Sequence, residues 1–160
     1  MLPTPPEGLR HWRPEDAPAL EAAWADPDIA RWNPPPDRLD ADAWIAGAEQ
    51  RWEHRLALDL VIVPDVAGEV GLSGFTTDPA RAELGVWVAA PHRRTGAARR
   101  AVEAVTAWAL DPDGLAVDQL WARTDPANLA AEALFDRLGW DRLGASDGKT
   151  IWSATTAVLR

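Results

Sequence analysis

A short basic segment with a single glycine is the part of this sequence best suited to chemistry. It lies between the apolar run 84–88 and a stretch with helical periodicity, and it consists of Arg93, Arg94, Thr95, Gly96, Ala97 and Ala98. Backbone N–H groups at the start of a helix lack partners within the helix and lie at the positive end of its dipole. The segment therefore predicts a pyrophosphate cradle, in which Gly96 permits close approach. The alternative is a solvated, arginine-rich helix start.

A second motif lies further along the chain, where Asn128 and Ala131 precede Leu138-Gly139-Trp140. The two motifs, in this order, resemble those of the GNAT N-acetyltransferase superfamily. The coenzyme A loop of that family has Arg or Gln, two residues, Gly, one residue, and then Gly or Ala. The segment 93–98 fits this pattern through its arginine, glycine and last alanine.

Two further segments extend the resemblance over nearly the whole chain. Residues 9–16 and 82–88 resemble the Rim-type branch, which acetylates the N-termini of ribosomal proteins. The resemblance implies one α/β (α+β) domain over residues 1–160. Its sheet would be mixed and mostly antiparallel, with about seven strands, four flanking helices, and splayed fourth and fifth strands.

The same resemblance implies acetyl-CoA as co-substrate. Its pyrophosphate would bind at residues 93–98, and its pantetheine arm would lie along the exposed strand edge at Val86, Trp87 and Val88. Asn128 would hydrogen-bond the pantetheine arm; the alternative is a polar residue exposed in the first turn of a helix.

The implied reaction is direct attack of an amine on the thioester, through a tetrahedral intermediate whose oxygen needs a donor. We expect the Val88 N–H to be that donor. Glu83, at the head of the fourth strand, is our candidate for the base that removes the amine proton, with Glu69 and His11 as alternatives.

Phe135 marks a departure from the family, because many relatives have a tyrosine seven residues after the motif asparagine. This chain has no tyrosine at all. A phenol therefore cannot act as the acid, which leaves water, Ser73, Thr124 or no acid.

Tryptophan is frequent, with ten in the chain. Trp24, Trp32, Trp44 and Trp52 lie in the segment that builds the acceptor side in this family. Tryptophans at helical spacing usually anchor a core, so Trp32, beside the proline run 34–36, is our candidate for acceptor binding. The acceptor could be a small amine, an aminoglycoside-like base or a peptide N-terminus. The rival interpretation is a catalytically silent module that binds an acyl-CoA or a partner protein.

Hydrophobic periodicity predicts the elements that must position these residues. Strands are predicted at about 8–13, 58–63, 69–76, 82–88 and 117–124, with a closing hairpin of 140–143 and 150–159. Helices are predicted at about 16–24 with Asp16 as N-cap, at 40–56, at 98–109, and at 126–138 with Asp125 as cap. A loop is predicted at 26–36, where prolines interrupt the chain.

Composition narrows the classes of partner. The net charge of −9 disfavours nucleic acid and anionic membranes and favours a cationic acceptor; the alternative is that the excess acidic residues only keep the protein soluble. The absence of cysteine excludes disulfides and thiolate metal sites, and no metal is expected. No apolar run is long enough to cross a bilayer, so we expect a cytoplasmic protein. A homodimer is left open.

Overall fold

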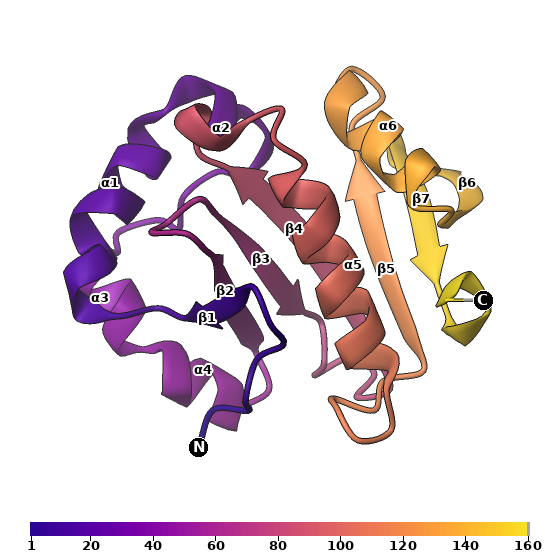
Figure 1. Cartoon of the computed structure of the whole chain (residues 1–160), viewed down its shortest axis with the longest axis horizontal. Helices are drawn as coiled ribbons and strands as arrows, with labels where there is room; N and C mark the ends of the chain where they lie inside the picture. The colour runs from indigo at the N-terminus through magenta and orange to yellow at the C-terminus, as the bar shows by residue number, and fades with distance from the viewer. Residues whose placement is uncertain (160) are drawn as a thin grey trace.

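The computed structural model describes residues 1–159 and contains one sheet covered by helices (Figure 1). Its seven strands lie in the order β1-β2-β3-β4-β5-β7-β6. Neighbouring strands are antiparallel except β4 and β5, which are parallel. The strands are β1 (Leu9–His11), β2 (Ala57–Ile62), β3 (Gly68–Ser73), β4 (Arg81–Val88), β5 (Gln119–Thr124), β6 (Asp141–Ser146) and β7 (Lys149–Ala154). This mixed, mostly antiparallel sheet confirms the expected fold class.

Six α-helices accompany the sheet where the sequence predicted four. They are α1 (Ala17–Ala25), α2 (Pro27–Trp32), α3 (Ala41–Ala46), α4 (Ala48–Glu53), α5 (Ala97–Leu110) and α6 (Leu129–Arg137). Short 3₁₀ helices cover Pro14–Asp16, Ala90–His92 and Thr156–Leu159. None of the helices in residues 1–159 is long and apolar enough to span a membrane.

The additional helices have local causes. The loop predicted at 26–36 was partly wrong, because Pro27 occupies the first turn of α2, where a missing N–H costs nothing. Asp26 caps this helix, since its Oδ1 accepts a hydrogen bond of 2.9 Å from the Asp28 N–H. The helix predicted at 40–56 is divided at Gly47 into α3 and α4.

Two predicted caps also differ. Asp16 occupies the predicted N-cap position of α1, but its side chain makes no capping hydrogen bond to that helix; its carboxylate accepts hydrogen bonds from the Arg13 N–H at 2.8 Å and from Arg10 at 2.7 Å. The predicted start of the last helix was wrong as well. Asn128 caps α6, and Asp125 instead closes a turn by accepting from the Ala127 N–H at 2.9 Å.

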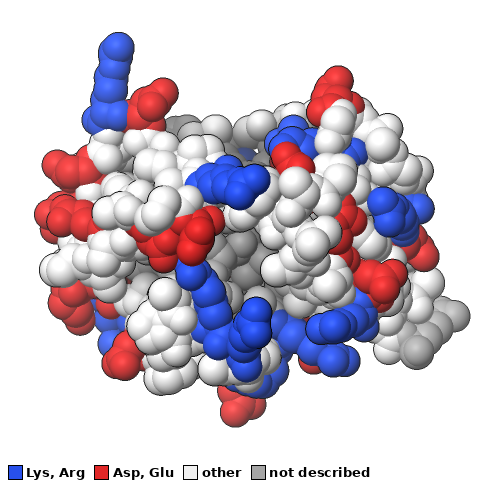
Figure 2. Space-filling model, turned by 90° about the horizontal axis from the view of Figure 1, so that it is seen from above, with Lys and Arg blue, Asp and Glu red and all other residues white. Residues whose placement is uncertain are grey.

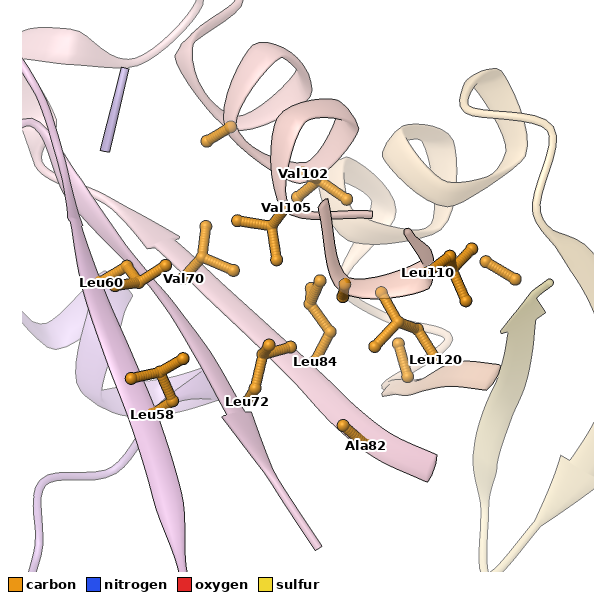
Figure 3. Close-up of a cluster of buried hydrophobic side chains, with 14 of the residues drawn as sticks. Leu58, Leu60, Val70, Leu72, Ala82, Leu84, Val102, Val105, Leu110 and Leu120 are labelled. Carbon is orange, nitrogen blue, oxygen red and sulfur yellow. The ribbon is translucent and has the colours of Figure 1, made fainter. Parts of the chain in front are cut away.

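The core has one part on each face of the sheet. On the first face, the apolar stripe of α5 packs onto the strands, and Figure 3 shows Val102 and Val105 pointing toward Val70 and Leu84. On the opposite face, α1, α2 and α3 cover a smaller cluster that includes Trp12. The side chains of alternate residues in each strand therefore point to opposite faces of the sheet, and this alternation determines on which face each functional side chain lies.

Candidate active site

The strands β4 and β5 separate at the centre of the sheet. Their register pairs are Arg81 with Gln119, Ala82 with Leu120, and Glu83 with Trp121. Within residues 1–159 no later residues of these two strands pair, although β4 continues to Val88 and β5 pairs onward with β7. The predicted splay is thus confirmed, and one edge of β4 faces a gap.

Alternation along β4 decides which backbone groups face that gap. The Ala89 N–H, just after the strand, donates to the Ala67 carbonyl at 2.8 Å, so odd-numbered residues of β4 hydrogen-bond toward β3. Leu84, Val86 and Val88 consequently direct their N–H and C=O groups toward the gap. The Val88 carbonyl accepts a hydrogen bond of 3.2 Å from Arg93 Nε.

Trp87 differs from its neighbours in strand β4. It pairs with Glu69 of β3, and its buried indole lies on the face covered by α1 to α3. Of the three residues predicted to contact a pantetheine arm, Val86 and Val88 therefore lie at the open edge through their backbone. Trp87 does not.

The predicted phosphate cradle forms the N-terminus of α5. Gly96 is the N-cap with φ of +80°, a left-handed conformation that favours glycine. The Thr95 hydroxyl donates to the His92 carbonyl at 2.6 Å, and Arg100 Nη1 donates to the Thr95 carbonyl at 2.8 Å, which fixes the loop. Ala97 is buried and Ala98 half-buried, so no large side chain occupies the first turn.

Basic side chains concentrate near this loop although the whole chain is acidic. Arg94, Arg99 and Arg100 are exposed around the start of α5. Figure 2 shows Lys and Arg side chains gathered along one side of the molecule, with many acidic side chains over the N-terminal half. The loop is thus a local basic region.

Arg93 has a different surrounding from Arg94. Its guanidinium lies 3.0 Å from a carboxylate oxygen of Asp26 and 3.5 Å from one of Asp28. The backbone hydrogen bond from Asp28 and the contact with Arg93 lower the pKa of Asp26. Arg93 therefore connects the loop to α2 and to the end of β4.

A pocket of about 310 Å³ opens on the other face of β3 and β4. Its floor contains Gly71 and Gly85, which are cross-strand partners. A Cβ atom at Gly85 would meet no atom within 4 Å, so the pocket reaches the backbone of β4. The residues that line the pocket are Trp24, Asn33, Pro34, Pro36, Trp44, Glu69, Gly71, Gly85 and Trp87.

Trp32, the predicted acceptor-side aromatic, is not among these residues; Arg31 stacks over its ring at 4.4 Å. Trp24 and Trp44 line the pocket instead, and their rings meet edge to face at 6.2 Å. Both belong to the predicted acceptor segment, but helical spacing alone could not show which tryptophans the pocket would expose.

Glu69 is the ionisable side chain of this pocket. Its two oxygens accept hydrogen bonds from the indoles of Trp12 at 2.9 Å and Trp87 at 3.2 Å. Burial and the nearby charge of Asp59 raise the pKa of Glu69, and the indole hydrogen bonds oppose that shift only in part. Asp59 itself lies 3.5 Å from Arg51 Nε.

Glu83, our first candidate for the base, is held in an ion pair. Its oxygens lie 2.9 Å from Nε and 3.3 Å from Nη2 of Arg123, a residue of β5. The pair bridges the two strands where they separate. His11 lies on β1, which β2 and β3 separate from β4, and its Nε2 is 2.6 Å from the Pro3 carbonyl.

Of the remaining predicted residues, Asn128, Phe135 and Thr124 lie on or under α6, whereas Ser73 ends β3. The Asn128 Oδ1 accepts from the Ala131 N–H at 3.2 Å, so it caps the helix. Phe135 is 3% exposed, with ring centroids 4.8 Å from Trp140 and 6.0 Å from Trp152. Thr124 accepts a hydrogen bond from Trp152 Nε1 at 2.8 Å, and Ser73 pairs with Glu83 across β3 and β4. The described residues contain no group of three His, Cys, Asp or Glu side chains that could hold a metal ion.

Known proteins share this architecture. A Mycobacterium smegmatis RimJ structure in complex with CoA-disulfide is 22% identical, with 94% of this chain and 82% of that chain covered and a TM-score of 0.73. The structure of spermidine N-acetyltransferase from Vibrio cholerae in complex with CoA and spermine is 14% identical, with 95% of this chain and 97% of that chain covered and a TM-score of 0.77. The structure of ribosomal-protein-S5-alanine acetyltransferase from Vibrio fischeri is 18% identical, with 97% of each chain covered and a TM-score of 0.77.

At these identities the structures establish a shared fold. No curated protein sequence is significantly similar to the chain. The sequence model of the acetyltransferase (GNAT) domain, in contrast, matches residues 8–141, which is most of the chain. The chain therefore belongs to the GNAT family and is an acetyltransferase.

Proposed function

We propose that the protein transfers the acetyl group of acetyl-CoA to a primary amine. The observation that carries this proposal is the open edge of β4 next to the N-terminus of α5. Strand edges bind extended ligands through backbone hydrogen bonds, and helix N-termini bind phosphates. A coenzyme A molecule offers both, as pantetheine amides and a pyrophosphate.

Most of the residues predicted for the donor site then have proposed roles. Val86 and Val88 pair with the pantetheine amides, while the backbone N–H groups of residues 94–98 and the exposed Arg94 bind the pyrophosphate. The side chain of Asn128 already caps α6 through its oxygen, and its NH₂ group can still donate to the pantetheine arm.

The reaction is direct transfer between two bound substrates. The amine nitrogen forms a bond to the thioester carbon, and the Val88 N–H donates to the developing oxyanion. The C–S bond then breaks, and coenzyme A leaves as a thiolate with the electron pair. Of the three protons of the bound ammonium, one passes to a carboxylate on the α1 to α3 face, where Glu83 and Glu69 both lie, one passes to water after the attack, and the third stays on the amide nitrogen of the product.

The acceptor is a cation by charge complementarity with the acidic chain. The three acceptor classes expected from the sequence are all compatible with that charge. The structures described above include enzymes named for spermidine and for ribosomal proteins, which supports an amine or peptide acceptor. The cytoplasm stays a prediction from the sequence.

Thermal unfolding with acetyl-CoA tests the donor site. A hundredfold excess over the dissociation constant should add about 2.7 kcal/mol to the free energy of unfolding. Arg94→Glu should abolish this gain while it leaves the free protein as stable as before, because Arg94 is exposed. Arg93→Glu should also destabilise the free protein, since it would face Asp26 at the present 3.0 Å contact.

Arg137→Glu on the exposed side of α6 is the matched control, and it should keep the full gain. An unchanged gain in the Arg94→Glu variant would show that the phosphate site lies elsewhere.

A catalytically silent acyl-CoA-binding module is the second candidate, favoured by Phe135 at the position of the usual tyrosine. Thiol release in the presence of amines separates the two. An enzyme releases coenzyme A in proportion to the amine, whereas a silent module binds acetyl-CoA without amine-dependent release.

A further inference from the structure

We infer, on the basis of the acetyl transfer proposed above, that the tryptophan-lined pocket selects acceptors with one primary ammonium on an apolar or aromatic body, and that Glu69 removes the ammonium proton. The pocket is the one floored by Gly71 and Gly85. This assigns a substrate class and a catalytic base to the acceptor side.

The lining of the pocket matches such an acceptor. Glu69 is the one ionisable residue among the described lining residues, so the site complements a single positive charge. Trp24, Trp44 and two prolines form an apolar wall, and tryptophan rings attract cations as well as apolar groups. A polyamine has several charges and would need several carboxylates along the pocket.

The two indole hydrogen bonds fix the orientation of the Glu69 carboxylate in the wall of this pocket. Each of its oxygens accepts one indole N–H, and a carboxylate has about four acceptor positions. Lone pairs thus remain on both oxygens for an ammonium or a water. The other charged groups near Glu69 are Asp59 of β2 and Arg51 of α4, which lie beside each other at 3.5 Å.

The glycine pair connects this carboxylate with the open edge of β4. Glu69 lies diagonally across from Gly85 in the β3–β4 register, and the Cα atoms of such diagonal neighbours are about 7–8 Å apart. Gly85 lies between Leu84 and Val86, whose backbone groups face the gap where the thioester is proposed to bind. An amine nitrogen in the pocket on the Trp87 side of Gly85, opposite Glu69, can therefore approach the thioester carbon at the edge of β4 and reach Glu69 directly or through one water.

The proton balance is simple. The ammonium gives one proton to the Glu69 carboxylate, and the neutral nitrogen then attacks as described above. Burial raises the pKa of Glu69 to about 8 and so brings its basicity closer to that of the amine, and general base catalysis should therefore increase as pH rises toward about 8, where the carboxylate becomes deprotonated. Glu83 is less suited, because Arg123 occupies both of its oxygens.

Turnover of an amine panel tests the substrate class. We expect kcat/KM for phenethylamine and hexylamine to exceed that for spermidine at least tenfold, measured by thiol release at saturating acetyl-CoA. An equal or higher value for spermidine would overturn the proposed class. Calorimetric binding of phenethylamine without acetyl-CoA gives a second readout, and Trp24→Ala should weaken that binding at least fivefold.

Glu69→Gln tests the base. It should lower kcat by at least 10²-fold, leave the stabilisation by acetyl-CoA unchanged, and remove the acidic limb of the pH–rate profile. Glu21→Gln, an exposed carboxylate of α1, is the matched control and should change none of these. A kcat within threefold of wild type in Glu69→Gln would overturn the assignment.

The experiments distinguish a failure of Glu69 as the base from a failure of the proposed acetyl transfer. If Glu69→Gln does not fold, the pH–rate profile of the wild type decides, because a profile without an acidic limb would overturn Glu69 as base. If no amine is acetylated, the acetyl transfer fails. Calorimetry then decides the pocket alone: no binding of phenethylamine would overturn its assignment as well.

Discussion

Glu69 also determines how stability should change with pH. Its pKa is raised to about 8 by burial and by Asp59, so between the ordinary 4.5 and about 8 the folded state holds a proton that the unfolded state has lost. The free energy of unfolding must therefore fall as pH rises through this window. Asp59, whose pKa is raised by burial, contributes in the same direction.

We expect Glu69→Gln to flatten this fall, because a neutral amide cannot titrate. Urea unfolding at several pH values from 5 to 8 measures the effect. Asp16→Asn is the control, because the pKa of Asp16 is shifted in the opposite direction and this variant should leave the fall between pH 5 and 8 unchanged. Burial alone would raise the pKa of Asp16, but hydrogen bonds from Arg10 and the Arg13 N–H lower it, so its contribution is lost only at more acidic pH. Parallel wild-type and Glu69→Gln curves would contradict the expectation.

Phe135 packs at the position where the family resemblance would imply a tyrosine. Because a thiol ionises near pH 8.5, a thiolate is a tolerable leaving group, and an acid offers little there. Phe135→Ala should cost about 3–5 kcal/mol, since the ring is buried between Trp140 and Trp152. Phe135→Tyr should change turnover by less than about threefold. A tenfold rise in the thiol-release assay would show that the wild type lacks a useful acid.

The sequence named Glu69 only as an alternative base, for a physical reason. Its partners Trp12 and Trp87 come from a loop and from another strand, and only the register of the sheet brings them together. Likewise, the ion pair of Glu83 with Arg123 depends on how far β4 and β5 remain paired. Periodicity identifies the face of a residue but not its partner across strands.

At the scale of elements, the start of α5 offers the sharpest test. Gly96→Ala should cost about 1–2 kcal/mol, because φ of +80° is strained for residues with a Cβ. It should also reduce the stabilisation by acetyl-CoA, since the added Cβ would lie 2.7 Å from Arg100 Nη1 and disturb the loop.

Gly139→Ala is the matched control, because Gly139 has φ of +74° and open space where a Cβ would be added, but lies after α6. Chemical unfolding with and without acetyl-CoA should show a similar stability cost in both variants and a weaker ligand effect only in Gly96→Ala. An equal ligand effect in both would contradict a phosphate site at Gly96.

Strands and long helices could be predicted because one strong pattern determines each of them. The stripe of α5 and the alternation of β4 correspond closely to the observed α5 and β4. The short α2 could not, because Pro27 breaks a helix in most positions and is tolerated only in the first turn, and the sequence does not say where that turn begins.

At the scale of the whole molecule, charge is divided by function. The chain has a net charge of −9, yet arginines surround the start of α5, where an anionic ligand is proposed to bind. The proposed acceptor pocket contains one carboxylate and no basic residue among its described lining. The two substrates are thus attracted to different parts of the surface, which total charge alone does not reveal.

The division of β4 between its edge and its face has a consequence for changing the enzyme. The donor side depends on backbone groups of residues 84–98, whereas the walls of the acceptor pocket come largely from residues 24–44, on α1 to α3 and their connections. Because the two sets hardly overlap, exchanging the segment 24–44, with Asp26 and Asp28 retained as the partners of Arg93, should redirect the enzyme to new amines while it keeps its donor.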